Sequence, residues 1–149
     1  MTSNIRRNKK RNNWWQQWPN ANIGIVTGQV SNLVVIDIDP RHKGETSWKQ
    51  FTRTLVLKTT LEVKTGGGGT HLYYKMPQTH ITNRTNLLPG VDVRASGGYI
   101  VAPGSLHQSG LFYEWANDVE IAELPEAFPK LNHTNRFVKI ARITRKICI

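Results

Sequence analysis

Residues 33–39 read LVVIDID, an apolar run that ends in two aspartates with one residue between them. A short run of Leu, Val and Ile is typical of a buried strand. Side chains two residues apart on a strand point to the same face, so the carboxylates of Asp37 and Asp39 would repel each other unless one were protonated or a positive charge lay between them. The run therefore predicts a buried strand that ends beside either a protonated aspartate or a positive charge.

Two explanations of the aspartate pair are open at this point. Asp39 followed by Pro40 is typical of the start of a turn, and the pair would then be a solvated strand end. Alternatively, the two carboxylates are oxygen ligands for a divalent cation, held on a rigid element. The rest of the chain has to distinguish them.

Length and composition limit the class of protein. The chain has 149 residues, enough for one domain with a substantial core. It contains no apolar run near the ~20 residues that span a bilayer, and its N-terminus lacks the apolar stretch of a secretory signal. A single cysteine, Cys148, excludes an internal disulfide framework and a Cys-rich zinc site. We therefore expect an intracellular, cytoplasmic protein with no membrane partner.

The net charge of +10 is concentrated at the two ends of the chain. Eleven of the 20 Lys and Arg residues lie in residues 1–11 and 130–149, whereas all 10 acidic residues lie between these segments. Basic ends of this kind commonly contact the phosphates of nucleic acid, although they can also be solubilising tails. The candidate nucleic-acid contacts in the C-terminal segment are Arg136, Lys139, Arg142, Arg145 and Lys146.

The hydrophobic pattern predicts mainly strands. Alternation and turn residues predict strands at residues 22–28, 33–39, 61–65, 71–76, 91–95, 98–104 and 111–115. Helical spacing predicts a helix at residues 45–57, a short helix within residues 8–20 and a basic amphipathic helix at residues 134–149. We interpret the three tryptophans of the short helix, Trp14, Trp15 and Trp18, as core residues. This order of elements predicts an α+β fold with a largely antiparallel sheet.

A glycine-rich stretch, TGGGGTH at residues 65–71, connects two of the predicted strands. It lacks the lysine and the following helix of a Walker phosphate loop. Glycines still allow backbone N–H groups to approach phosphate oxygens, and His71 would face the same pocket. The alternative is a flexible hairpin followed by an ordinary strand histidine. The candidate nucleotide contacts here are Thr65, Gly66, Gly67, Gly68, Gly69 and His71.

Asp92 lies within an apolar strand, where an unpaired carboxylate would be costly. Arg94, two residues further on, points to the same face and is a candidate ion-pair partner. Alternatively, Asp92 joins Asp37 and Asp39 in a three-carboxylate site, and Arg94 faces a bound anion. Three carboxylates together with the phosphates of a nucleotide suit Mg²⁺ or Mn²⁺.

Several of these motifs occur together in a known order. The succession WWxxWPxANIGIxTG, SxLVVIDIDP, VKTGGGGTHLYYK, GVDVRASGGYIVAPGS and YEW resembles the N-terminal domain of bifunctional DNA primase/polymerases, in the archaeo-eukaryotic primase superfamily. The resemblance runs from about residue 14 to residue 115. It implies a catalytic core with an RRM-like, largely antiparallel sheet flanked by helices.

The resemblance also implies roles for individual residues. Asp37, Asp39 and Asp92 match metal ligands, and His71 matches the histidine that contacts the triphosphate of the incoming nucleotide; these four would be the catalytic residues. Ser105 and His107 match a Ser-x-His that often follows in the family, and they are candidate nucleotide contacts together with Arg94.

The implied activity is metal-dependent, template-directed nucleotidyl transfer that makes and extends primers. The implied cofactor is Mg²⁺ or Mn²⁺, and the partners are a single-stranded DNA template, NTP or dNTP, and a separate replicative helicase, in the replication of a plasmid, phage or mobile element. We expect a basic tail at residues 1–13, the catalytic domain at residues 14–129, shortened at its N-terminus, and a basic amphipathic helix at residues 130–149. A non-catalytic nucleic-acid-binding accessory module, or a decayed copy, is the alternative.

Overall fold

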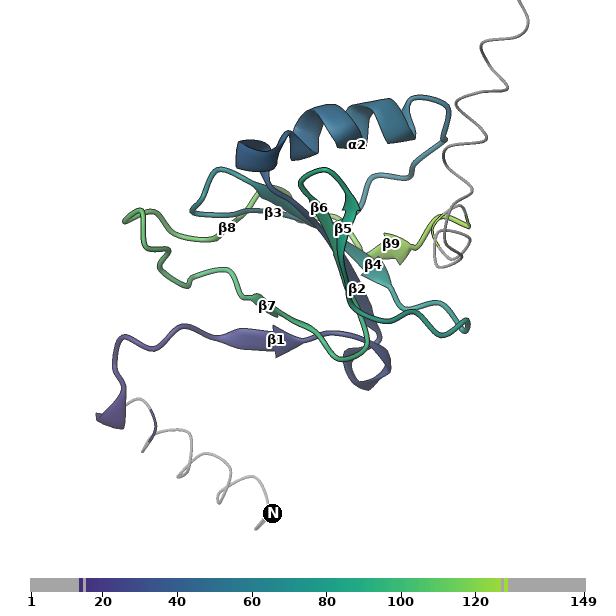
Figure 1. Ribbon diagram of the computed structural model, residues 1–149. Helices are drawn as coiled ribbons and strands as arrows, with labels where there is room; N and C mark the ends of the chain where they lie inside the picture. The colour runs from purple at the N-terminus through teal and green to yellow at the C-terminus, as the bar shows by residue number, and fades with distance from the viewer. Residues whose placement is uncertain (1–13, 15, 127, 129–149) are drawn as a thin grey trace, which may run out of the picture.

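Strand β2 (Leu33–Ile38) is central to the larger of two sheets, and five of its six residues are buried. The structure, a computed structural model, describes residue 14, residues 16–126 and residue 128 (Figure 1). β2 pairs antiparallel with β4 (Thr70–Lys75) on one side and with β6 (Val91–Arg94) on the other. The strand predicted at residues 33–39 is therefore confirmed, and it ends one residue earlier.

The larger sheet has seven strands in the order β5-β6-β2-β4-β3-β8, with β9 also paired to β4. Every pairing in it is antiparallel except that of β4 with β9. This mixed, mostly antiparallel sheet confirms the α+β prediction. Its other strands are β3 (Glu62–Lys64), β5 (Arg84–Leu88), β8 (Glu114–Trp115) and β9 (Ala122–Glu123), of which β5 and β9 were not predicted.

Both faces of β2 are covered, which explains why its sequence is apolar throughout rather than alternating. Val34 and Ile36 belong to a core cluster on the face that helix α2 (Gly44–Thr52) covers. Leu33 and Val35 belong to a second cluster on the opposite face, together with Ile100. Ile100 comes from a separate two-stranded ribbon formed by β1 (Gly24–Val26) and β7 (Tyr99–Val101), which lies across this face (Figure 1).

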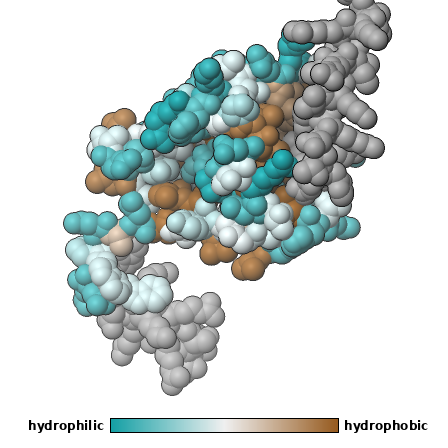
Figure 2. All heavy atoms as spheres, in the orientation of Figure 1, coloured by the Kyte–Doolittle hydropathy of each residue, from teal (hydrophilic) through white to brown (hydrophobic). Residues whose placement is uncertain are grey.

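Helix α2 packs on the sheet through aromatic side chains. The rings of Trp48 and Phe51 contact that of Phe128 at centroid distances of 5.6 and 5.4 Å. The outer surface of the helix is hydrophilic (Figure 2). The helix ends at Thr52, five residues before the predicted end. The chain turns after the helix, where the N–H of Leu55 donates to the carbonyl of Thr52 at 2.9 Å.

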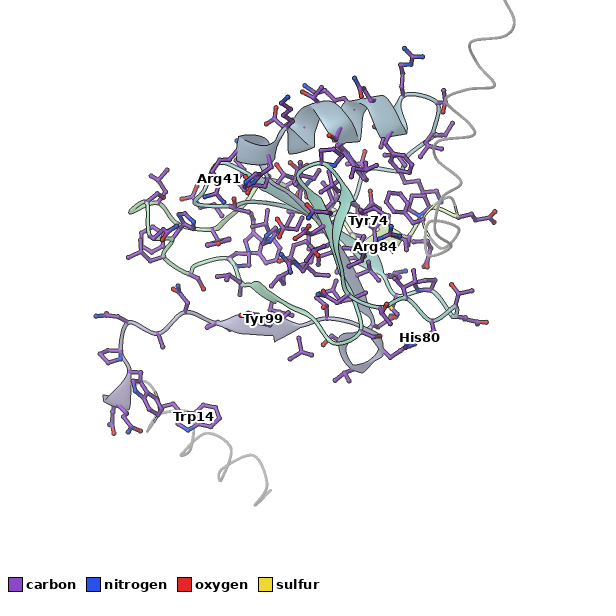
Figure 3. The ribbon with its side chains drawn as sticks, in the orientation of Figure 1. Trp14, Arg41, Tyr74, His80, Arg84 and Tyr99 are labelled. Atoms are coloured by element: carbon purple, nitrogen blue, oxygen red, sulfur yellow. The ribbon has the colours of Figure 1, made fainter. Side chains whose placement is uncertain are left out.

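The interpretation of the N-terminal tryptophans as core residues is wrong for Trp14 and Trp18, which are 59% and 54% exposed. Trp14 lies away from both sheets (Figure 3). The predicted helical turn is present, because the Trp18 N–H donates to the Trp14 carbonyl at 2.7 Å. The physical reason for the exposure is that α2 and the β1–β7 ribbon already cover the two faces of the larger sheet.

The predicted basic tail (residues 1–13) and C-terminal helix (residues 130–149) lie outside the described residues. The five candidate nucleic-acid contacts, Arg136, Lys139, Arg142, Arg145 and Lys146, lie there as well. Among the residues that are described, no helix combines the length and apolar character needed to cross a membrane.

Candidate functional site

Three polar side chains form a row across the middle of the larger sheet. Asp37 of β2 lies directly opposite His71 of β4 and also opposite Asp92 of β6. Residues that face each other on antiparallel strands carry their side chains on the same side. Asp37 continues the series of Leu33 and Val35, so the row lies on the ribbon-covered face, beyond the apolar cluster. The register of β2 thus brings together three residues from separate motifs.

Arg94 supplies the positive charge that the two facing carboxylates require. Its Nη2 donates to Asp92 Oδ2 at 2.8 Å and to Asp37 Oδ2 at 3.2 Å. Asp37 Oδ1 lies 3.5 Å from Nε2 of His71, whose side chain is only 6% exposed. The ion pair of Asp92 with Arg94, one of the two explanations offered by the sequence, is therefore present, and it extends to Asp37.

The surroundings of Asp37 keep it ionised. Burial raises the pKa of this carboxyl, but the hydrogen bond and charge of His71 and the charge of Arg94 outweigh burial, so that the pKa lies below its ordinary value. At neutral pH, Asp37 is therefore an anion in a partly buried position, which is the state that binds a cation.

Asp39 has separate cationic partners, on the 3₁₀ helix η2 (Pro40–His42). Its Oδ1 accepts from the backbone N–H and Nε of Arg41 at 2.9 and 3.0 Å, and its Oδ2 accepts from Arg41 Nη2 at 2.9 Å. Nδ1 of His42 lies 3.0 Å from Oδ2. The side-chain hydrogen bond from Arg41 is the main cause that lowers the pKa of Asp39 to about 2. Arg41 is labelled near the start of α2 in Figure 3. The turn at Asp39–Pro40 that the sequence indicated is present.

Both carboxylate oxygens of Asp92 accept hydrogen bonds. While Oδ2 accepts from Arg94, Oδ1 accepts from the backbone N–H of Asn86 at 2.7 Å. Asn86 lies at a β-bulge in β5 and has φ of 52°, in the left-handed region that non-glycine residues rarely adopt. This irregularity in β5 directs a backbone donor to the Asp92 carboxylate.

The glycine-rich turn is closely packed at both ends. The N–H of Gly68 donates to the carbonyl of Thr65, and the N–H of Gly69 donates to its hydroxyl, both at 2.9 Å. A Cβ at Gly69 would lie 2.5 Å from the carbonyl oxygen of Ile38. A Cβ at Gly66 would lie 2.3 Å from Cβ of His107. Glycine is therefore required where the turn meets β2 and where it meets the loop that carries His107.

These elements surround a cleft of about 530 Å³, which we call the site cleft. Its size is typical of small-molecule sites. The site cleft is lined by residues from β2, η2, the glycine turn, β4, the β5–β6 hairpin and the loop before β8, among them Asp37, Asp39, Arg41, His42, Thr65, Gly67, Gly69, His71, Asn86, Asp92, Arg94, His107 and Tyr113.

The site cleft contains most but not all of the residues singled out in the sequence. Three predicted nucleotide contacts, Gly66, Gly68 and Ser105, do not line it. The Ser105 hydroxyl instead accepts from the N–H of Ile23 (3.1 Å) and thereby holds the chain before β1. Sequence reasoning missed Arg41, Asn86 and Tyr113. Burial raises the pKa of Tyr113, and the negative charge of Asp37 raises it further. The only sequence signal for the role of Arg41 is that it is a basic residue two positions after Asp39.

The chemistry of the donors fits a divalent cation at Asp37 and Asp92. Both carboxylates accept from a single nitrogen of Arg94, so a positive group already stands between two oxygen ligands of the kind that Mg²⁺ and Mn²⁺ prefer. Asp39 is bonded to Arg41 instead. In the part of the chain that the structure describes, no three Asp, Glu, His or Cys side chains are gathered as metal ligands. The three-carboxylate set implied by the resemblance is thus not assembled in this arrangement.

Comparisons with known proteins identify the family. A search of curated proteins finds no match. Among family models, the one described as bifunctional DNA primase/polymerase, N-terminal, matches residues 3–127, which include every residue of the site cleft. This match spans far more than half of the chain, and it confirms the resemblance recognised in the motifs. The chain belongs to the Prim-Pol family of bifunctional DNA primase/polymerase N-terminal domains.

Proposed function

We propose that this chain is a template-directed nucleotidyltransferase of the primase/polymerase type, and that it joins nucleotides in the site cleft. The observation that carries the proposal is the row of Asp37, His71 and Asp92, which the register of three neighbouring strands brings to one face in a member of this family. We further propose that the larger sheet is the RRM-like core of the archaeo-eukaryotic primase superfamily.

The reaction is the extension of a strand by one nucleotide. The 3′-hydroxyl oxygen of the strand forms a bond to the α-phosphorus of a nucleoside triphosphate. The bond from that phosphorus to the oxygen bridging to the β-phosphate breaks, and pyrophosphate and a proton are released. Such a reaction depends on positioning and on stabilising negative charge rather than on a covalent enzyme intermediate.

Asp37 and Asp92 would hold a divalent cation, Mg²⁺ or Mn²⁺, and Asp39 would join them after releasing Arg41. The cation would neutralise phosphate charge and lower the pKa of the attacking hydroxyl. Arg94, relieved of its two carboxylates, would donate to the phosphates. His71, buried beside Asp37, would orient the phosphate chain, and the glycine turn would allow it to approach the backbone closely.

The partners follow from the same activity. We propose a single-stranded DNA template and NTP or dNTP as substrates, with strand separation by a separate helicase. The basic residues of the C-terminal segment, Arg136, Lys139, Arg142, Arg145 and Lys146, would contact template phosphates. Because each phosphate contact releases counterions, affinity for single-stranded DNA should fall steeply as salt rises.

The test is primer synthesis and extension on single-stranded DNA with labelled nucleotides, in Mg²⁺ or Mn²⁺. Asp37→Asn and Asp92→Asn should abolish the metal-dependent product while leaving DNA binding intact. Glu123→Gln, which removes an exposed carboxylate paired with Lys75 at 3.0 Å, is the matched control and should leave synthesis unchanged. Synthesis that persists in both aspartate variants would refute the assignment. DNA binding without any synthesis by the unaltered protein would favour a non-catalytic accessory module instead.

A further inference from the structure

Helix α2 contacts the larger sheet at β2, β5 and β6. The face that it covers continues onto β4, β3 and β8, because residues that face each other on paired strands carry their side chains on the same side. Ile36, which belongs to the core cluster under α2, faces Leu72, and Leu72 faces Glu62. We call this continuation the lateral face; its residues are Thr70, Leu72, Glu62, Lys64 and Glu114.

Two hollows lie on the lateral face. The larger has a volume of about 390 Å³ and is lined by residues of β3, β8, α2 and the glycine turn, and by Leu111 and Phe112. The smaller has a volume of about 260 Å³ and is lined by Leu72 and Tyr74 of β4, with residues of β3 and of the loop before it. Leu111 and Phe112 are 63% and 53% exposed. Apolar side chains that gather around open volume in this way mark a surface that binds another element.

The charge around the two hollows is opposite to that of the chain as a whole. Glu62 lines the smaller hollow, and Glu45 and Glu114 line the larger one. None of these three carboxylates forms an ion pair with another described residue. Together with Lys58 and Lys64 they leave an excess of one negative charge, in a protein whose net charge is +10. A basic, partly apolar occupant is therefore complementary to this face.

The sequence beyond the described residues has this complementary composition. Residues 130–149 contain six Lys and Arg residues and no acidic residue. In the helix that the sequence predicts at residues 134–149, one side is an apolar stripe of Phe137, Ile140, Ala141, Thr144 and Ile147. At about 3.6 residues per turn, Lys139, Arg142 and Lys146 fall on the opposite side. Such a helix can bury its stripe on a sheet and keep these three cations in solvent.

Phe128, the last residue that the structure describes, lies within reach of the lateral face. Its ring contacts that of Tyr74 at a centroid distance of 6.4 Å, and Tyr74 lines the smaller hollow. Residues 129–133 can span at most roughly 20 Å, so the predicted helix can begin at this hollow. The helix would be roughly 24 Å long, whereas the way from Tyr74 to Glu114 covers about 14 Å along β4 and about 10 Å across to β8. It is therefore long enough to cross both hollows.

We propose that residues 134–149 bind along the lateral face, beside α2, as an amphipathic helix. Its apolar stripe would cover Leu72 and Phe112, and the flanking residues Arg136 and Arg145 would face Glu62 and Glu114. The larger hollow shares two of its lining residues, both in the glycine turn, with the site cleft. The bound helix would therefore lie next to the cleft and carry its outward basic residues to the rim.

The test uses Cys148, the single cysteine of the chain. In the whole 149-residue chain, Phe112→Cys places a second thiol at the larger hollow. Tyr99→Cys, at an aromatic residue that is 68% exposed on the β1–β7 ribbon, is the matched control. With diamide as the oxidant, the disulfide to Cys148 within one chain should form at least about tenfold faster from position 112 than from position 99, because binding raises the effective concentration of one thiol at the other.

Substitutions in the segment and on the lateral face test the contacts. Phe137→Asp together with Ile140→Asp charges the apolar stripe and should reduce the rate at position 112 to that at position 99. Asn135→Asp, on the basic side of the predicted helix, is the control and should leave the rate unchanged. Glu62→Gln together with Glu114→Gln should slow the reaction severalfold, and high salt should slow it as well, since exposed charge pairs are screened.

A nitroxide on Cys148 of the otherwise unaltered protein provides a second measurement. It should broaden the backbone amide signals of β3, β8 and Phe112 selectively and leave those of β1 unchanged. Uniform broadening, broadening of the β1–β7 ribbon instead, or equal disulfide rates at positions 112 and 99 would overturn the proposal. A disulfide between two chains, seen as a doubled mass without reductant, would also overturn it, because the occupant would then come from a second copy. None of these measurements requires nucleotide joining, so their outcome is independent of the proposed function.

Discussion

Asp37 of β2 and Asp92 of β6 face each other directly across the larger sheet, and their Oδ2 atoms both accept from the same nitrogen of Arg94. Like charges in directly opposite positions destabilise a sheet unless a counter-charge accompanies them. The guanidinium therefore has a structural role whenever no other cation is bound, and its removal should have a consequence that depends on the metal present.

Arg94→Ala should lower the free energy of unfolding by about 1–3 kcal/mol in EDTA, because two partly buried carboxylates lose their shared counter-charge. Mg²⁺ or Mn²⁺ should then raise the Tm of this variant more than that of the unaltered protein, since a divalent cation can occupy the place between the carboxylates. Urea denaturation and thermal melts measure both effects.

The control for this prediction is Lys75→Ala, which breaks an exposed ion pair with Glu123 and should leave the free energy of unfolding almost unchanged, with no dependence on metal. If Arg94→Ala is as stable as the unaltered protein, or if metal stabilises the two proteins equally, Arg94 does not act as the shared counter-charge.

Asp39 should make stability depend on pH in a defined acid range. Its pKa is about 2 in the folded protein, below the ordinary value of 3.8, because of Arg41. A carboxyl whose pKa is lowered by folding stabilises the protein above the ordinary pKa, and this contribution is lost as the pH falls through the folded value. Unfolding by urea in EDTA should therefore become easier as the pH falls from about 4 to about 2.

Asp39→Asn should flatten this part of the curve, because the amide does not titrate. The relevant quantity is the difference between the two proteins, since Asp37, whose pKa is also lowered, contributes to both curves in the same direction. Parallel curves for variant and unaltered protein between these pH values would contradict the prediction.

The part of the fold that the sequence made predictable is the part in which burial is uniform. The apolar run at β2 predicted a buried strand because α2 and the β1–β7 ribbon cover both of its faces. Asp37, His71 and Asp92 could each be recognised within a motif. That they form one row could not be derived, since it depends on the register of β4 and β6 against β2, and a shift of one residue would have reversed every side chain.

Other features of the fold and the site have no sequence pattern that predicts them. β5 contains a bulge and Asn86 at positive φ, so its side chains do not alternate in a way that predicts a strand. β9 has only two residues. Arg41 bonds Asp39 through a short 3₁₀ turn, whereas Tyr113 reaches the cleft from a distant loop. Such contacts are set by tertiary structure, and propensity does not encode them.

Gly66 and Gly67 are adjacent in sequence but should respond very differently to alanine. A Cβ at Gly66 would lie 2.3 Å from Cβ of His107 and 2.5 Å from the carbonyl oxygen of Leu111, so Gly66→Ala must displace the loop. We expect a loss of about 1–3 kcal/mol in unfolding free energy. A Cβ at Gly67 meets nothing closer than 3.4 Å, and Gly67→Ala should stay within about 0.5 kcal/mol. Equal stabilities of the two variants in urea would show that the loop does not rest on the turn.

Asn86 provides the last prediction, because its left-handed backbone directs an N–H to Asp92. Asn86→Gly should keep stability within about 1 kcal/mol, since glycine adopts φ of 52° without steric cost. Asn86→Val should lose about 1–3 kcal/mol, because a β-branched side chain strains this conformation. The Asn86 side chain itself is exposed, so the difference between the two variants reports the backbone and not a lost contact. Urea unfolding of both variants measures it, and a valine variant as stable as the glycine variant would mean that the bulge relaxes and that Asp92 does not depend on it.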